Sequence, residues 1–322
     1  MSDQTLDWIT LIEPSSEPHT VIIETSEPHT QLNHLTAVRN TVRHICENYP
    51  KPIRLMCTSG VDSQSMIWAF SEYAPDDIEI EIHSFVYNNK TNWYDVSNLS
   101  EYAEHWGFDL YYHDFDLLEF LDSGDCRSIQ EAYQTRSPQI ASHIKFLQQF
   151  QSGTNIQAGE IGQSDRLRIG FLGPEHVGMI RFAKHHNTLT DHHKVVPFFF
   201  ISDSQIARSV CGKYTQGNKL RSAAKKYFPE SEYNGYIMKC TRYKHLGYDI
   251  VPQDQKYTGF EEFKDLYDEH HKATPQERLK ASQISNILGQ KLRSTRAFDI
   301  HHRYLPDFVI RQRSSVQFNP II

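Results

Sequence analysis

Six consecutive residues have the types and spacing of a phosphate-binding loop: Thr58, Ser59, Gly60, Val61, Asp62 and Ser63. Small residues let a backbone approach an anion closely, and the free N–H groups at a helix start point toward it. Asp62 would repel a phosphate unless a divalent cation lay between them, so it indicates bound Mg²⁺. The chain has no Gly-x-x-x-x-Gly-Lys-Ser/Thr segment, which excludes a Walker-type loop. We call residues 58–63 the phosphate loop.

The residues around the phosphate loop predict a strand–turn–helix unit that would position it. Residues 53–57 form an apolar run typical of a buried strand. A helix is predicted over 62–74, with Met66, Ile67 and Phe70 at helical spacing on one face. The loop would therefore join the carboxyl end of a strand to the amino end of a helix.

The same alternation continues along the chain. Further strands are predicted at 78–86, 108–113 and 155–158, with helices at 94–106 and 128–151. Strands that alternate with helices predict an α/β fold with a doubly wound parallel sheet. Ligands of such sheets bind at the carboxyl ends of the strands. Tyr87 and Asn88 follow one of these strands, and we expect them to border an adenine or ribose.

These patterns divide the chain into three parts. Residues 1–50 form an N-terminal extension, in which 21–24 is predicted to be a strand of a local hairpin or an added edge strand. Residues 51–175 form the nucleotide-binding α/β domain. After residue 175 the β pattern fades, so residues 176–322 are predicted to be a mainly helical substrate region.

The composition narrows the class of protein. The 322 residues are 39% hydrophobic and 23% charged, a globular profile. There is no signal-peptide pattern and no apolar run near the roughly 18 residues of a membrane helix, so we expect a cytoplasmic protein. The net charge of −7 argues against a large nucleic-acid face. The five cysteines form no Cys-x-x-Cys and are typical of reduced residues without a zinc site.

The phosphate loop resembles the PP-loop of the N-type ATP pyrophosphatases, whose motif is Ser-Gly-Gly-x-Asp-Ser; here Thr58 replaces the first Ser and Ser59 the first Gly. Later segments resemble, in order, the synthetase domain of asparagine synthetases and β-lactam synthetases. They are Gly159-Glu160, Pro197-Phe198-Phe199, Lys219-Leu220-Arg221, Phe228-Pro229 and Arg242-Tyr243-Lys244. The family's Asp three residues after the Glu is replaced here by Gln163. The resemblance covers residues 53 to 250.

This resemblance implies an ATP-dependent adenylating synthetase. A substrate carboxylate would attack the α-phosphorus of ATP, giving an acyl-adenylate and pyrophosphate, and an amine would then displace AMP. Lys244, together with Mg²⁺ held by Asp62, would neutralise the phosphates. Glu160 would deprotonate the amine or share the metal. The nucleotide contacts implied are the phosphate loop with Tyr87, Gly159, Lys219 and Arg221.

The resemblance also bears on partners. Asparagine synthetases carry a glutaminase domain with a nucleophilic Cys after Met1, whereas this chain begins Met1-Ser2-Asp3. The expected substrates are a small-molecule carboxylate and an amine donor, with nitrogen from ammonia, a separate amidotransferase or a substrate amine. No membrane partner is expected, and a homodimer is a further expectation.

Two other functions stay open from the sequence. The first is a PP-loop enzyme that modifies a nucleobase or tRNA by adenylating a base carbonyl; its sulfur-inserting forms need reactive cysteines, and Cys46 and Cys57 lie in segments predicted to be buried. The second is a nucleotide-binding fold kept as a non-catalytic interaction protein. The altered loop sequence and Gln163 keep this last hypothesis open.

Overall fold

The chain is built around a five-stranded parallel sheet with the strand order β5-β4-β3-β6-β9. Its strands are β3 (Ile53–Met56), β4 (Ile80–Tyr87), β5 (Asp109–Phe115), β6 (Gly153–Gln157) and β9 (His193–Val196). The computed structural model describes residues 9–11, 21–23, 32–133, 135, 137–159, 162–164, 169–171, 174–203, 205–206, 209, 217–231 and 235–253.

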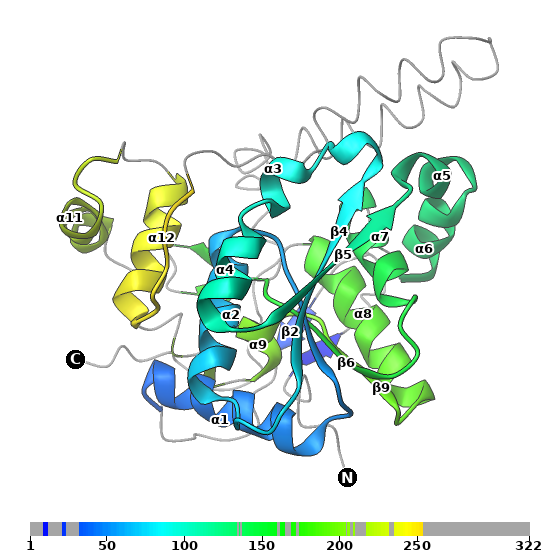
Figure 1. Ribbon diagram of the computed structural model, residues 1–322, viewed down its shortest axis with the longest axis horizontal. Helices are drawn as coiled ribbons and strands as arrows, with labels where there is room; N and C mark the ends of the chain where they lie inside the picture. Colours follow the sequence, from blue (N-terminus) through cyan, green and yellow to red (C-terminus); the bar gives the residue numbers. More distant parts are fainter. Residues whose placement is uncertain are drawn as a thin grey trace.

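Helices cover both faces of this sheet (Figure 1). One face carries α1 (His34–Asn48), α2 (Val61–Tyr73), α4 (Leu99–Trp106) and α12 (Gly235–Leu246). The other carries α5 (Leu117–Asp122), α6 (Asp125–Tyr133), α7 (Pro138–Leu147) and α8 (Pro174–Leu189). Shorter or peripheral elements are β1 (Ile9–Leu11), β2 (Val21–Ile23), η1 (Asn88–Lys90), α3 (Trp93–Val96), β7 (Gly162–Ser164), β8 (Ile169–Phe171), α9 (Phe199–Ser202) and α11 (Gly217–Tyr227). The predicted doubly wound α/β fold is confirmed.

The alternation of side chains along each strand produces two hydrophobic cores. Leu55 packs into the core under α1 and α2, whereas its neighbour Met56 packs into the core under α5 to α8. Val196 and Val195 divide between the two cores in the same way. Strands β3 and β9 carry apolar side chains on both faces, as parallel strands covered by helices do, whereas the edge strand β5 is largely exposed.

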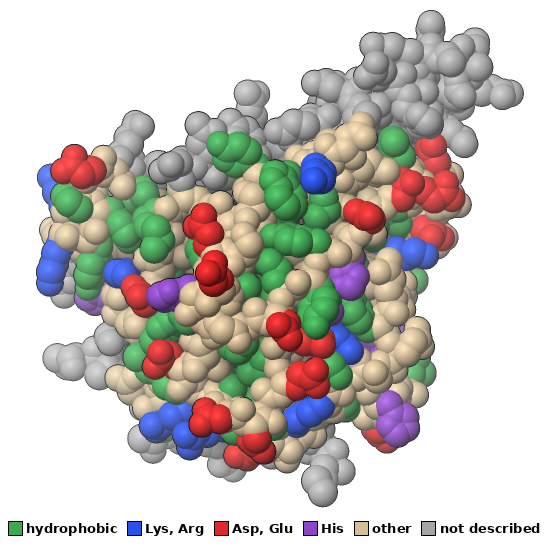
Figure 2. Space-filling view, in the orientation of Figure 1, with side chains coloured by type: hydrophobic (Ala, Val, Ile, Leu, Met, Phe, Trp, Pro, Cys, Tyr) green, Lys and Arg blue, Asp and Glu red, His purple; other side chains and the backbone are tan. Residues whose placement is uncertain are grey.

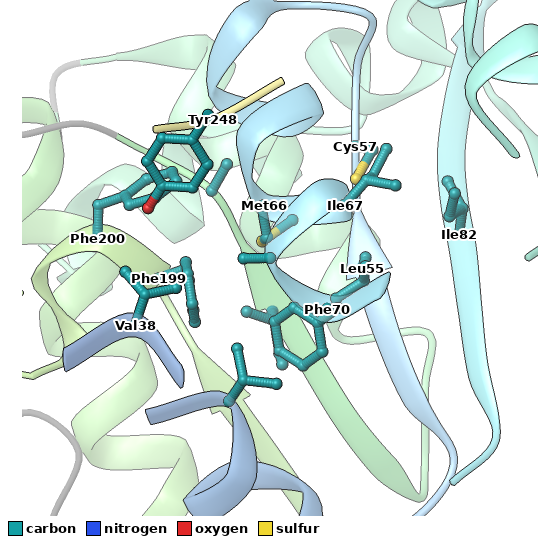
Figure 3. Packing of buried hydrophobic residues seen from close by; sticks show 14 of the residues in the cluster. Val38, Leu55, Cys57, Met66, Ile67, Phe70, Ile82, Phe199, Phe200 and Tyr248 are labelled. Atoms are coloured by element: carbon teal, nitrogen blue, oxygen red, sulfur yellow. The ribbon is translucent and has the colours of Figure 1, made fainter. Parts of the chain in front are cut away.

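The helix that follows the phosphate loop is buried on several sides. Figure 3 shows Met66 and Phe70 of α2 packed with Leu55 of β3 and with aromatic rings from later in the chain. The ring centroids of Phe70 and Phe199 lie 5.4 Å apart. This packing fixes α2, and therefore the loop at its amino end, against the sheet.

The structure corrects two details of the prediction. The region after residue 175, predicted to be mainly helical, also contributes β9 to the main sheet. The four residues of β9 are too short for a clear period and bear apolar side chains on both faces. The helix predicted over 94–106 is divided into α3 and α4 at Ser97 and Asn98, although both keep right-handed helical backbone angles.

Other expectations have mixed outcomes. The hairpin predicted around 21–24 is confirmed, because β2 pairs antiparallel with β1. The boundaries at 50 and 175 stay predictions, and residues 254–322 lie outside the described residues. Within the residues that the structure describes, every helix is too short or too polar to cross a membrane; cytoplasmic localisation stays a prediction.

A chain of buried polar groups links the last two strands to α8. His193 of β9 contacts the amide of Asn155 on β6 at 2.8 Å and His186 of α8 at 3.0 Å. Burial, with further contributions from His186 and Arg54, lowers the pKa of His193 to about 4. His193 is therefore neutral in the folded protein at neutral pH.

We predict that this histidine makes the protein sensitive to mild acid. His193 binds a proton near pH 6.5 in the unfolded chain and only near pH 4 in the folded protein. Its contribution to the free energy of unfolding is therefore complete above pH 6.5 and is lost as the pH falls toward 4. Urea unfolding of the wild type and of His193→Gln at several pH values measures this. The variant should show a shallower fall in unfolding free energy over that window. Equal slopes would mean that His193 does not contribute.

Candidate functional site

The phosphate loop lies where the winding of the sheet reverses. From β3 the chain moves outward to β4 and β5, and then returns to the other side of β3 to form β6 and β9. The crossovers that leave β3 and β6 therefore run in opposite directions, and the carboxyl ends of these two strands border a crevice, which is the usual ligand site of such sheets. The phosphate loop follows β3, and Gly159 follows β6.

Hydrogen bonds within the phosphate loop hold it in a tight turn. Ser63 Oγ accepts from the N–H of Thr58 at 3.1 Å, and Thr58 Oγ1 accepts from the N–H of Gly60 at 3.3 Å. The N–H of Ser59 donates to the carbonyl of Asp95 at 2.6 Å. Because the Thr58 hydroxyl acts as an acceptor here, its hydrogen can be donated to an anion. The Ser63 hydroxyl also forms a side-chain hydrogen bond with Cys57.

The start of α2 also fits a phosphate. Gly60 is its N-cap and provides no side-chain cap, so no side chain of this residue occupies the first-turn N–H groups. Ser59 Oγ is buried and has no hydrogen-bond partner among the residues that the structure describes. A buried hydroxyl without a partner is costly unless a bound group satisfies it. These features match the oxygen-rich triphosphate that the sequence predicts.

Asp62 faces two side chains from α12. Lys239 forms an ion pair with its Oδ2, and the Tyr243 hydroxyl donates to its Oδ1 at 2.6 Å. Lys239 and Tyr243 are four residues apart, so they lie on one face of α12. Neither residue was predicted to contact Asp62, although their four-residue spacing was a signal. Lys244, the cation predicted to neutralise the phosphates, donates to Asp249 at 2.7 Å, and its role toward a nucleotide stays a prediction.

Gln64 ties the segment after α12 to α2. Its side-chain amide donates to the carbonyl of Val251 and accepts from the N–H of the same residue, both at 2.9 Å. The same amide donates to the Tyr102 hydroxyl at 2.9 Å. This paired contact fixes the chain just beyond α12, so Lys239 and Tyr243 are held over the start of α2.

Tyr87 and Asn88 contact other parts of the protein in the structure, and their contact with a nucleotide stays a prediction. The Tyr87 ring is buried beside Phe85 and Phe115, and its hydroxyl lies 3.4 Å from Ser142 Oγ. Asn88 Oδ1 accepts from the N–H of Leu117 at 2.7 Å, at the start of α5. Tyr87, the last residue of β4, therefore belongs to the core of the other face, and Asn88 fixes the start of α5.

The roles predicted for Glu160, Lys219 and Arg221 stay predictions. Glu160 lies outside the described residues, and so does the side chain of Lys219. Arg221 is exposed on α11, and its contact with a nucleotide stays a prediction.

Gly159 has a backbone that disfavours a side chain. Its φ is +55°, and a Cβ there would lie 2.1 Å from Cδ1 of Phe198. The glycine predicted as a nucleotide contact is therefore also required for the close approach of β6 to the segment after β9. This approach brings the end of β6 next to the phosphate loop.

The described cysteines do not have the character of reactive thiols. Cys46, Cys57, Cys126 and Cys240 are all buried. Burial raises the pKa of Cys126 to about 12 and that of Cys240 to about 11. These thiols are protonated at neutral pH, so they do not provide the thiolate that sulfur chemistry needs. Cys211 lies outside the described residues.

Comparisons with known proteins give structural similarities alone. No family model and no curated protein matches the chain. It is similar to the structure of the U34-tRNA thiolase NcsA from Methanococcus maripaludis with its 4Fe-4S cluster. The two sequences are 12% identical, the match covers 80% of this chain and 78% of that chain, and the TM-score is 0.32. It is also similar to the structure of the glutamine-dependent NAD+ synthetase from Acinetobacter baumannii in complex with ADP. Here the identity is 11%, the match covers 73% of this chain and 50% of that chain, and the TM-score is 0.29. These values assign the chain to no family.

We predict that Gly159→Ala destabilises the protein by about 2–5 kcal/mol. The alanine would be strained at a positive φ, and its Cβ would clash with the Phe198 ring. Gly107→Ala is the matched control, since Gly107 has a φ of +72° and open space around the added Cβ. The control should lose about 1–2 kcal/mol from backbone strain alone. Urea unfolding of both variants measures the difference. Equal losses would contradict the close packing of Gly159 on Phe198.

Proposed function

We propose that this chain is a PP-loop enzyme that binds ATP on the phosphate loop and cleaves it between the α- and β-phosphates, releasing AMP and pyrophosphate. The observation that carries this proposal is the geometry of the loop at the reversal point of the sheet. It combines uncapped amides at a helix start, the hydroxyl groups of Thr58, Ser59 and Ser63, and the carboxylate of Asp62. A triphosphate with a divalent cation is the ligand that satisfies all three groups.

The residues of the loop have distinct roles in this proposal. Thr58 donates its hydroxyl hydrogen to a phosphate oxygen, Ser63 holds the turn through the N–H of Thr58, and the buried Ser59 hydroxyl gains the partner that it lacks among the described residues. Asp62 holds Mg²⁺, which when bound neutralises charge on the phosphates. The fixed N–H groups and hydroxyls need little rearrangement during the reaction, so they stabilise developing negative charge effectively.

For the acceptor we propose a carboxylate, on the basis of the synthetase-like order of segments from 53 to 250. The carboxylate oxygen forms a bond to the α-phosphorus as the bond to the pyrophosphate oxygen breaks. An amine nitrogen then attacks the acyl carbon, and AMP leaves with the electron pair of the broken C–O bond. Glu160 accepts the amine proton in this scheme.

A second candidate acceptor is a nucleobase. Trp93 and Tyr94 are 39% and 60% exposed on α3, and Tyr112 is 38% exposed beside them. Figure 2 shows hydrophobic side chains gathered over this region. The ammonium of Lys90 lies 4.9 Å from the centre of the Trp93 ring. Exposed aromatic rings next to a cation are a surface on which bases stack, and α3 adjoins the phosphate loop through the bond between Ser59 and Asp95.

We predict that the purified protein converts ATP to AMP and pyrophosphate in the presence of its acceptor, and that Asp62→Asn lowers this rate by about 10²–10³-fold or more. The reason is that the amide cannot supply the charge that holds the metal. Liquid chromatography of the nucleotide products over a panel of carboxylates measures it. Asp125→Asn, which alters an ion pair with Lys145 on the other face of the sheet, should behave as wild type. ADP and phosphate as products would contradict the proposal.

We predict further that Glu160→Gln separates the two steps. Adenylate formation should continue, observed as exchange of labelled pyrophosphate into ATP, while the final amide product is lost because the amine keeps its proton. Loss of both exchange and product would place Glu160 on the metal instead. Exchange that depends on added tRNA, with a shift of that tRNA on a native gel, would identify the nucleobase as the acceptor.

A further inference from the structure

The carboxylate of Asp62 has a protein cation next to it. Lys239 pairs with Oδ2, and the Tyr243 hydroxyl donates to Oδ1. The side chains of Lys239 and Asp62 are 17% and 19% exposed, so this ion pair is largely shielded from water. It is therefore stronger than a typical surface ion pair.

This arrangement affects how Asp62 can bind a metal. A divalent cation on the carboxylate would lie within a few ångströms of the Lys239 ammonium, and two positive charges repel strongly in a site with little water. The metal and the ammonium therefore compete for Asp62. Lysine has a flexible four-carbon stem, so its charge can leave the carboxylate without movement of α12.

Tyr243 differs from Lys239 because its ring is anchored. The ring is buried, with its centroid 5.4 Å from that of Phe200 and 5.5 Å from that of Tyr248. Its hydroxyl therefore stays at Oδ1 and orients the carboxylate while Lys239 moves. The contact of Gln64 with Val251 anchors the end of the same unit.

We propose that Lys239 is an exchangeable partner of Asp62: it pairs with the carboxylate when no metal is bound, and it moves to the phosphates of ATP when the metal takes its place. This inference rests on the proposed function and adds a residue and an order of events to it. Metal alone must displace Lys239 and gains no phosphate in return, so it binds weakly. Nucleotide offers the displaced ammonium a new partner, so nucleotide and metal bind cooperatively.

The test is a pair of affinities that should change in opposite directions. In Lys239→Met, the affinity for Mn²⁺ alone, followed by electron paramagnetic resonance, should rise about tenfold because the competing charge is gone. The affinity for ATP in the presence of saturating Mg²⁺, followed by calorimetry, should fall about tenfold because the phosphates lose a cation. Lys239→Gln should show the same two shifts, and it serves as the second variant if the first does not fold.

Lys145→Met is the matched control. Lys145 forms an ion pair of 2.7 Å with Asp125 on the other face of the sheet, so its loss should change neither affinity. A fall in both affinities for the Lys239 variants would show that Lys239 is a structural support, and unchanged affinities would show that it does not touch either ligand. Both results overturn the inference, while ATP binding by the wild type would leave the proposed function intact. A wild type that binds no ATP would overturn both.

A measurement on the wild type needs no variant. Acetylation of lysine side chains, read by mass spectrometry, should be faster at Lys239 in Mn²⁺ alone, because the ammonium has left its carboxylate. ATP should slow the same reaction by engaging the ammonium. Labelling of Lys239 that is unaffected by either ligand would contradict the exchange.

Discussion

The reversal of chain winding between β3 and β6 is the constraint on which the rest of this structure depends. Parallel neighbours must be joined by crossovers, and the crossovers from these two strands leave toward opposite edges of the sheet. This arrangement places the phosphate loop at the carboxyl end of β3 and Gly159 just after β6, at the reversal point where ligands of such sheets bind.

The electrostatics of the site follow from this position. The start of α2 has partial positive charge from its free N–H groups, which favours the Asp62 carboxylate in the first turn. Lys239 adds a full positive charge from α12. The site thus holds one carboxylate among positive groups, and a triphosphate with its metal would replace the internal ion pair with a larger set of paired charges.

The substrate side of the site depends on segments far apart in the chain. Gln64, just after the phosphate loop, holds the backbone of Val251, and Phe198 lies against Gly159. The first contact requires the amide of Gln64, and the second requires a residue without a side chain at Gly159. Together they hold the segments after β9 and α12 against the elements that carry the phosphate loop. A change in either contact would move Lys239 and the end of β6 relative to the phosphate loop.

The sequence by itself determined the strand–loop–helix unit at 53–74, most of the sheet and the alternation of elements, because each depends on periodicity and turn residues that are local in the chain.

The tertiary structure decided which late side chains reach the loop. Lys239 and Lys244 belong to the same basic run, and the packing of α12 on α2 turns Lys239 toward Asp62 and Lys244 toward Asp249. Tyr87 is the last residue of β4, and packing against the helices of the other face places its ring in the core. Such choices depend on contacts between residues some 180 positions apart, such as Asp62 and Tyr243, which no local pattern encodes.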